Sequence, residues 1–235
     1  MKWPPDYTIR RSARAKRMSI KIEDVHGLQV ILPKRMSERH VLPFVEQSRE
    51  WIERHLPKAL ANPRKEAWHE LPNSLALRAL NETWSIDYLK AAGPVRIISR
   101  PHEELVVMGD VDNRADCREM LDVWIRKRAK KYLSARTREL ADTHGFVVNN
   151  ISVRGQKTRW GSCCSRQNIS LNYKLIFLPA ELVDYVIVHE LCHTVHLDHS
   201  PSFWRLVEKF IPHYRQCKKQ VGQEQAFLPH WLKAI

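Results

Sequence analysis

The first half of the chain alternates apolar and polar residues over short stretches, a pattern typical of half-buried β-strands. Residues 20–22 and 28–32 alternate on either side of a turn at Gly27, and they predict a β-hairpin. Ser37 suits the N-cap of a helix that we expect to reach about residue 56 and to end at Pro57 and Pro63. Further along, the predicted strands cover 83–88, 95–98 and 105–107.

The second half changes to helical spacing. Apolar residues recur at this spacing after Asp112 or Asn113, and they predict a long helix that ends at Gly145. The elements expected next are a strand over 151–154, a hairpin of 157–162 and 168–171 around residues 164–167, a helix opening at Pro179, and a helix over 202–210 after a break at residues 199–201. This order predicts the α+β class, with a β-rich N-terminal half over residues 1–110 and a C-terminal domain over 111–235.

Composition narrows the class of protein. At 235 residues and 43% hydrophobic, the chain can bury one large core or two small ones. The densest apolar run, residues 182–188, is interrupted by Asp184 and is too short for a membrane span. The polar N-terminus differs from a signal peptide, and the 5 cysteines form no disulfide-like pattern. We therefore expect a cytoplasmic protein without a membrane partner; the pattern does not predict an oligomeric state.

The formal net charge of +13 exceeds what solubility requires and favours an acidic partner, such as a nucleotide, a nucleic acid or another polyanion. Residues 9–17 are the most basic run. They can steer a phosphate-rich ligand, but charge also keeps an exposed edge strand or arm soluble, and we favour that second interpretation.

The sequence His189-Glu190-Leu191-Cys192-His193 lies within the helix that opens at Pro179. Residues four apart share one face of a helix, so His189 and His193 can bind one metal ion. Glu190 is then placed to act as general base on a water molecule activated by the metal. Cys192 lies off the histidine face, and we interpret it as a core residue.

A catalytic zinc site usually has three protein ligands. His196 shares the face of His189 but lies about 10 Å further along the helix axis, too far for both rings to bind one ion. His199 follows His189 by ten residues, the spacing of the third ligand in metzincins, and a chain reversal would aim it at the metal. Glu208 is the rival; we prefer His199 and expect Glu208 to be a solvated acid.

Several separated motifs closely resemble the YgjP-like metallopeptidases, zinc hydrolases related to the SprT-like and other zincin-type peptidases. The motifs that carry the resemblance are Val-Arg-Gly-Gln-Lys-Thr-Arg-Trp-Gly-Ser-Cys over residues 153–163, Asn-Ile-Ser-Leu-Asn over 168–172, Leu-Pro at 178–179, Tyr-Val-Ile-Val-His-Glu-Leu-Cys-His over 185–193 and His-Ser-Pro-Ser-Phe-Trp over 199–204. The resemblance implies a zincin-like C-terminal domain with helices and a small sheet. It also implies His189, His193 and His199 as zinc ligands and Glu190 as the catalytic acid and base.

The resemblance further suggests that residues 159–162 form a strand lining the cleft, to which an extended peptide can add. Gly161 would permit a close backbone approach, and Arg154 or Arg159 can bind an anionic group of the substrate. We also consider Asn172 a substrate-binding candidate and, with Asp198, a residue that can orient the histidine rings. Trp160, Cys163 and Cys164 are interpreted as core residues.

Three functions are therefore compared. The leading one is a metallopeptidase with one Zn²⁺, or another divalent ion, per chain. The second is a nucleotide or phosphoester hydrolase on the same metal site, motivated by the positive charge. The third is a noncatalytic nucleic-acid-binding protein with structural zinc, which the base-like Glu190 disfavours because a structural site needs four ligands and no base.

Overall fold

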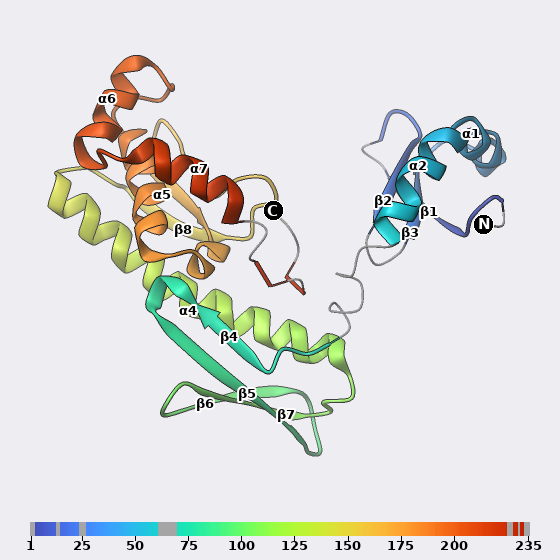
Figure 1. Cartoon of the computed structure of the whole chain (residues 1–235), viewed down its shortest axis with the longest axis horizontal. Helices are drawn as coiled ribbons and strands as arrows, with labels where there is room; N and C mark the ends of the chain where they lie inside the picture. The colour runs from blue at the N-terminus through green and yellow to red at the C-terminus, as the bar shows by residue number, and fades with distance from the viewer. Residues whose placement is uncertain are drawn as a thin grey trace. The chain divides into compact units, whose positions relative to one another are not determined.

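A computed structural model describes residues 3–12, 15–23, 27–60, 70–224, 228–229 and 231–232 (Figure 1). The chain divides into two compact units, Met1–His69 and Glu70–Ile235. Each unit is described by itself. Across the described residues, none of the helices combines the length and the apolar character needed to cross a membrane.

The first unit is built on a three-stranded sheet. Its strands are β1 (Tyr7–Ser12), β2 (Ser19–Glu23) and β3 (Gly27–Pro33) in the order β1-β3-β2. Strand β2 is antiparallel to β3, as expected for the predicted hairpin, and Gly27 is the first residue of β3. Residues 24–26 of the predicted turn lie outside the described residues. Strand β1, whose residues 9–12 belong to the basic run, lies parallel to β3 at one edge of the sheet.

Two helices cover this sheet instead of the single helix that we predicted. After a short 3₁₀ turn, η1 (Glu38–His40), come α1 (Val41–Gln47) and α2 (Arg49–Leu60). They are separated at Ser48, whose backbone leaves the helical region. Helix α2 continues past Pro57, so this proline does not end it, and Pro63 lies outside the described residues. The core of the unit contains Leu28, Val30, Leu32, Val41, Val45, Ile52 and Leu56.

The second unit begins with a four-stranded sheet. Its strands are β4 (Ser74–Leu77), β5 (Glu82–Lys90), β6 (Arg96–Arg100) and β7 (Glu104–Gly109) in the order β4-β5-β7-β6, and a 3₁₀ turn η2 (Arg78–Leu80) follows β4. Only the β5–β7 pair is parallel. The three predicted strands correspond to β5, β6 and β7.

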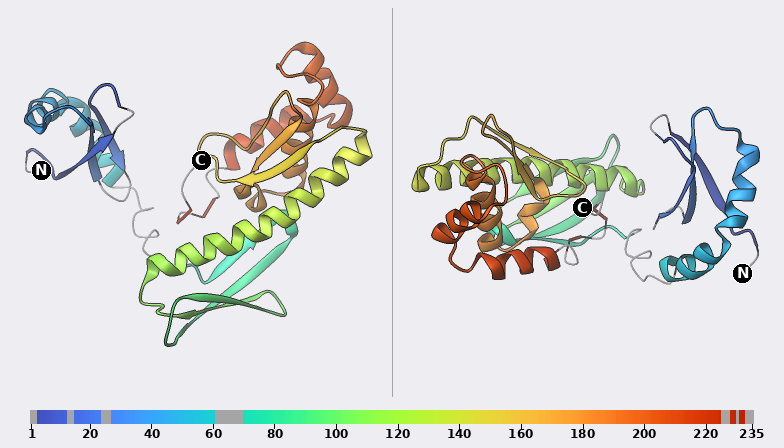
Figure 2. Two further views of the ribbon diagram at one scale, coloured as in Figure 1. Left: turned by 180° about the vertical axis from the view of Figure 1, so that it is seen from behind. Right: turned by 90° about the horizontal axis from the view of Figure 1, so that it is seen from above.

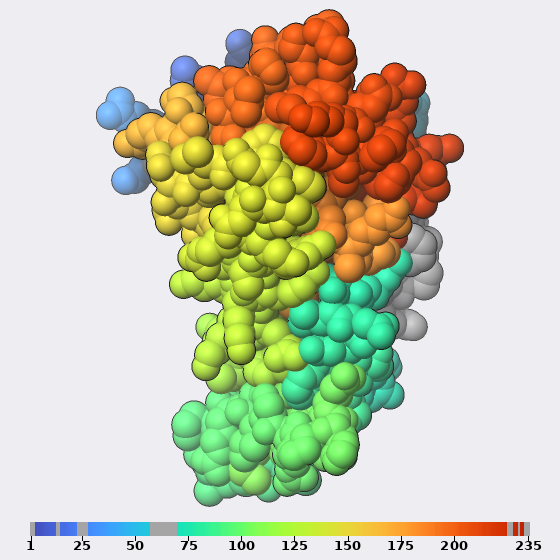
Figure 3. Space-filling model, turned by 90° about the vertical axis from the view of Figure 1, so that its left-hand side faces the viewer, coloured from blue at the N-terminus to red at the C-terminus, as the bar shows by residue number. Residues whose placement is uncertain are grey.

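Helix α4 (Arg114–His144) joins this sheet to the rest of the unit (Figures 2 and 3). The Asn113 side chain accepts a hydrogen bond from the Asp116 amide, and Gly145 adopts a φ of 73° after the last turn, so both predicted ends are confirmed. One face of α4 buries Cys117, Leu121, Ile125, Ala129, Leu133, Thr137, Leu140 and Ala141. Because one apolar cluster contains residues of β4–β7, α4 and the C-terminal helices, the compact unit begins near residue 70, and it differs from the division at residue 110 that we predicted.

A third sheet and three helices complete the second unit. The strands β8 (Asn150–Arg154), β9 (Gly161–Cys163) and β10 (Asn168–Asn172) lie in the order β8-β10-β9, with β9 antiparallel and β8 parallel to β10. A 3₁₀ segment η3 (Tyr173–Phe177) leads to α5 (Ala180–Cys192), α6 (Pro201–Phe210) and α7 (Tyr214–Glu224). Helices and sheets of mixed strand direction confirm the α+β class.

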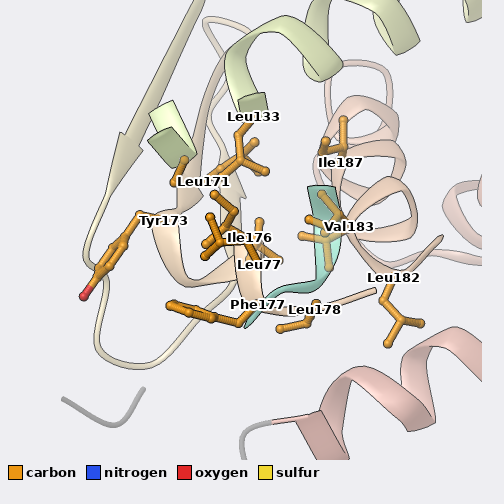
Figure 4. Packing of buried hydrophobic residues seen from close by; sticks show 14 of the residues in the cluster. Leu77, Leu133, Leu171, Tyr173, Ile176, Phe177, Leu178, Leu182, Val183 and Ile187 are labelled. Carbon is orange, nitrogen blue, oxygen red and sulfur yellow. The ribbon is translucent and has the colours of Figure 1, made fainter. Parts of the chain in front are cut away.

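Helix α5, which carries the histidine motif, is fixed in the core along most of its length. Figure 4 shows Val183 and Ile187 of α5 next to Leu133 of α4, Leu171 of β10 and Leu77 of β4. All five residues are fully buried, with 0% of their surface exposed. Burial of a leucine or isoleucine side chain contributes about 1.5–3 kcal/mol, so this junction holds the motif rigidly.

An ion pair also connects α5 to α4. The Arg136 guanidinium donates hydrogen bonds to both carboxylate oxygens of Asp184, at 2.8 and 2.7 Å. The two side chains are only 29% and 23% exposed. Arg136 also contacts Glu139, one turn away on the solvent side, whose side chain is 62% exposed.

We predict that Asp184→Asn lowers the free energy of unfolding by about 1–2 kcal/mol, because a half-buried bidentate pair loses one charge. The matched control is Glu139→Gln, which removes the exposed partner of the same arginine and should cost less than about 0.5 kcal/mol. Urea unfolding of both variants measures the difference. Equal effects of the two substitutions would show that the Arg136–Asp184 pair contributes no more to the free energy of unfolding than the exposed pair with Glu139.

Candidate metal centre

Three histidine side chains converge at the C-terminal end of α5. Their ligand nitrogens on His189, His193 and His199 all lie within 4.8 Å of one another. The Nε2 atoms of His189 and His199 are 3.1 Å apart. The structure therefore brings together the three residues that we predicted as metal ligands.

The local backbone explains how His199 reaches the other two. Helix α5 ends at Cys192, with His193 as its C-cap, earlier than the break at residues 199–201 that we expected. The amides of Val195 and His196 both donate to the Cys192 carbonyl and close the turn, at 3.1 and 3.0 Å. Because the helix stops at its second histidine, ten residues suffice to bring His199 back to the first.

Hydrogen bonds on the C-terminal side of His199 also fix the position of its backbone. The Asp198 carboxylate accepts a hydrogen bond from the Ser200 amide at 3.3 Å, and the Ser200 hydroxyl accepts one from Phe203 at 3.4 Å. Ser200 is the N-cap of α6, and Pro201 occupies the first helical position. Asp198 thus helps to position His199 through the backbone, and it makes no hydrogen bond to a histidine ring among the described residues.

The three imidazoles fit a zinc ion. With Zn–N bonds of about 2.0–2.1 Å in a tetrahedron, two ligand nitrogens lie about 3.3 Å apart, close to the spacing between His189 and His199. The Nδ1 of His193 lies 2.8 Å from the His196 carbonyl. An Nδ1–H donating there leaves Nε2 of His193 free to bind the metal. His196 therefore contributes its carbonyl, and its ring is not part of the cluster.

The electrostatic setting keeps two of these rings neutral, the state that binds a metal. Burial, and to a lesser extent charge repulsion from His193, His199 and Lys218, lowers the pKa of His189 to about 3. Burial also lowers the pKa of His193. The buried Nδ1 of His189 has no hydrogen-bond partner among the described residues.

Aromatic side chains form the wall behind the histidines. The fully buried Phe203 stacks on His193, with ring centroids 4.3 Å apart, and its edge meets His189 and His199. Trp204 lies nearly parallel to His199 at 5.6 Å and to Tyr214 at 5.1 Å. The Lys218 ammonium lies 4.5 Å from the Trp204 ring. No pattern in the sequence indicated that α7 contributes to this wall.

Glu190 is buried beside the cluster, where its side chain packs on the backbone of β9. Burial raises the pKa of its carboxyl to about 8, and the positive charge of Arg159 opposes this increase. A Cβ atom built on Gly161 would lie 2.6 Å from Oε1 and 2.7 Å from Cγ of Glu190. The absence of a side chain at Gly161 therefore allows Glu190 to pack on β9, whereas the close backbone approach that we predicted at this position stays a prediction.

The three residues predicted to bind substrate, Arg159, Arg154 and Asn172, lie in different parts of the unit and differ in their exposure to solvent. Arg159 is exposed two residues before β9, close enough to Glu190 to affect its pKa. Arg154 ends β8, on the opposite edge of the sheet from β9. Asn172 is fully buried, and its amide donates to the carbonyls of Gln156 and Arg159, both at 3.0 Å. Asn172 thus holds the segment that precedes β9, and its burial leaves it no surface for a substrate.

The remaining predictions concern neighbouring residues. Glu208 is exposed on α6 and is not part of the cluster, as we expected. Cys192 is buried, and Trp160 is half-buried against the core. Cys163 is half-buried near Glu190, and burial raises its pKa to about 11. Cys164 is exposed in the β9–β10 turn, so its interpretation as a core residue is wrong.

Comparisons with known proteins agree with the resemblance noted from the motifs. A search of curated proteins finds no match. Among solved structures, the chain is similar to the metallopeptidase zymogen of Pyrococcus abyssi abylysin, with 23% identity over 39% of this chain and 93% of that one and a TM-score of 0.37. It is also similar to the metallopeptidase zymogen of Methanocaldococcus jannaschii jannalysin, with 18% identity over 39% and 95% of the two chains and a TM-score of 0.36.

The family comparison covers far more of the sequence. Residues 16–224 match the model of the YgjP-like metallopeptidase domain. The match spans both compact units, and it includes every residue of the histidine cluster and Glu190. The chain therefore belongs to the YgjP-like metallopeptidase family, whose members are metal-dependent hydrolases.

Proposed function

We propose that this protein is a zinc-dependent peptidase in which His189, His193 and His199 hold one zinc ion and Glu190 transfers protons. The observation that supports this most directly is the convergence of three imidazoles within 4.8 Å of one another, next to a buried carboxyl. Three protein ligands leave one position of a tetrahedron for water or substrate, which is the arrangement of a catalytic zinc site.

A zinc ion held by His189, His193 and His199 would polarise the carbonyl of a bound peptide and would lower the pKa of a bound water to about 7. Glu190 then accepts a proton from the attacking water and returns it to the leaving amine. Burial favours the protonated carboxyl, whereas a divalent cation beside it favours the carboxylate. These opposed effects allow Glu190 to bind and release a proton near neutral pH.

The edge strand β9 supplies a surface for an extended peptide. Among the described residues β9 pairs only with β10, so its other edge carries backbone groups that a substrate strand can bind. Gly161 on β9 lies against Glu190, so a peptide paired there would pass close to the catalytic carboxyl. The exposed Arg159 next to this strand is suited to bind an acidic side chain or a terminal carboxylate of the peptide.

The distribution of charge weighs against a nucleotide or phosphoester substrate. Residues 1–69 contain 15 Lys and Arg against 8 Asp and Glu, a net charge of +7, whereas residues 70–235 contain 24 against 18, a net charge of +6. The two units thus carry nearly equal net charge, but the charge per residue is higher in the small first unit than in the unit that holds the histidines. If the protein binds a nucleic acid or another polyanion, the first unit is the better candidate for that contact.

We expect the purified, zinc-loaded protein to cleave an unfolded protein into fragments and to release no phosphate from nucleoside triphosphates. Gel electrophoresis and a phosphate assay, each with Glu190→Gln as control, measure the two activities. Phosphate release that depends on Glu190, without proteolysis, would favour the phosphoester alternative. Salt-sensitive nucleic-acid binding without either activity would favour the noncatalytic one.

We predict that His189→Ala and His193→Ala each lose the zinc of this centre, because two ligands cannot hold the ion tightly. Glu190→Gln should keep the zinc and lower kcat by about 10²–10⁴-fold, the usual contribution of a general base. Elemental analysis and peptide cleavage measure the two effects. The control is Glu208→Gln, an exposed acid on α6 that should change neither. Wild-type turnover by Glu190→Gln would exclude the proton-transfer role.

We predict that Gly161→Ala keeps the zinc but lowers kcat by about 10²-fold. The added methyl group collides with the buried Glu190 side chain, and a displacement of about 1 Å in a catalytic group can have an effect of this size. Gly222→Ala on α7 is the matched control, since nothing lies within 4 Å of its added Cβ atom. Full activity of Gly161→Ala would mean that the position of Glu190 against β9 is unimportant.

A further inference from the structure

A second group of metal-binding side chains lies outside the catalytic cluster. Glu181, His213 and Cys217 present ligand atoms that all lie within 4.8 Å of one another, the one such group besides the three histidines within the described part of the chain. The Nε2 atom of His213 is 2.7 Å from Oε1 of Glu181. The catalytic proposal does not use these residues.

Two helices bring the group together. Glu181 lies in the first turn of α5, and His213 lies directly before α7, which contains Cys217. The Cys217 amide donates to the His213 carbonyl at 3.3 Å, so the helical turn begins at His213 and places both side chains on one face. The spacing of four residues is the same as that between His189 and His193. Packing of α7 on α5 then supplies the third residue from a position 32 residues earlier in the sequence.

The three donors are those that zinc prefers. Thiolate, imidazole and carboxylate are all common zinc ligands, and the sulfur favours zinc over magnesium or calcium. In a tetrahedral site the donors would lie about 3.3–3.6 Å apart. The short contact between His213 and Glu181 must therefore open by about 0.6 Å. That movement is easy because the two side chains are 49% and 65% exposed.

The burial of Cys217 excludes a different role for the same three residues. A cysteine beside a histidine and a glutamate has the composition of a nucleophilic triad. However, Cys217 is 0% exposed, and burial raises the pKa of its thiol, so it is neither accessible to a substrate nor readily ionised. A metal ion needs no substrate access, because it approaches from the side of the exposed His213 and Glu181 and displaces the thiol proton when it binds.

We propose that Glu181, His213 and Cys217 form a second metal site, which binds Zn²⁺ with water in the fourth position and fastens α7 to the start of α5. This site goes beyond the proposed peptidase mechanism and does not depend on it. Its effect reaches the catalytic centre through a chain of contacts: Tyr214 follows His213, its ring stacks on Trp204, and Trp204 stacks on His199. The second ion would thus stabilise the wall behind the catalytic histidines.

The decisive experiment measures zinc in a variant without the catalytic ligands. After zinc loading and removal of free metal, the double variant His189→Ala/His193→Ala should retain one zinc per chain. Adding Cys217→Ser to it should remove this zinc. Absence of zinc from the double variant, or unchanged zinc after the addition of Cys217→Ser, would overturn the second site. Neither outcome depends on peptidase activity, so a failure here is separate from a failure of the proposed mechanism.

Cobalt substitution gives a second readout in the intact protein. The catalytic cluster offers only imidazole nitrogens, so an intense near-ultraviolet thiolate-to-cobalt absorption band from Co²⁺-loaded wild type would come from Cys217. The band should disappear in Cys217→Ser and persist in Cys164→Ser, which removes an exposed cysteine outside the group. Glu181→Gln, at a mostly exposed side chain, should weaken cobalt binding at least tenfold without unfolding the protein. Absence of the band in wild type, or its survival in Cys217→Ser, would contradict the site.

Discussion

The burial of Glu190 against the backbone of β9 is the constraint on which the arrangement of the candidate active site depends. Removing a carboxyl group from water is costly, and Glu190 is only 6% exposed. The strand can approach so closely only because residue 161 has no side chain. Asn172 holds the segment before this strand, and β10 leads through η3 to α5, which carries Glu190 itself. The strand and the helix that form the two sides of the site are therefore consecutive parts of one rigid substructure.

The protonation states of the candidate metal ligands and of the buried Glu190 carboxyl depend on the same burial and on the same metal charge. Burial raises the pKa of Glu190 and lowers that of His189, so without a cation both groups favour their neutral forms. A divalent ion at the three imidazoles binds to neutral rings and, by its charge, stabilises the carboxylate next to it. The same water-excluded environment would thus keep the histidine ligands neutral for a metal and strengthen the effect of the metal's charge on Glu190, the base that we propose.

Local sequence signals predicted a large part of this structure. Asn113 and Gly145 fix the ends of α4 because capping depends only on nearby residues, and the spacing of the histidines places them on one face for the same reason. The compact unit beginning near residue 70 was not predicted, because it depends on which apolar faces share a core across distant segments. The break at Ser48 and the parallel strand pairs were missed, since periodicity shows neither. The cluster of Glu181, His213 and Cys217 depends on the packing of α7 on α5, which the spacing within either helix cannot reveal.

The central claim is that three histidines and no other protein group hold the catalytic metal, with Glu190 beside its open position. A crystal structure of the zinc-loaded protein, with anomalous data collected at the zinc absorption edge, tests this most directly. We expect an anomalous peak about 2.0–2.1 Å from one nitrogen each of His189, His193 and His199, with a solvent or substrate atom completing the site on the side of Glu190. A fourth protein ligand closing this site, or the absence of zinc from these histidines in fully loaded crystals, would contradict it.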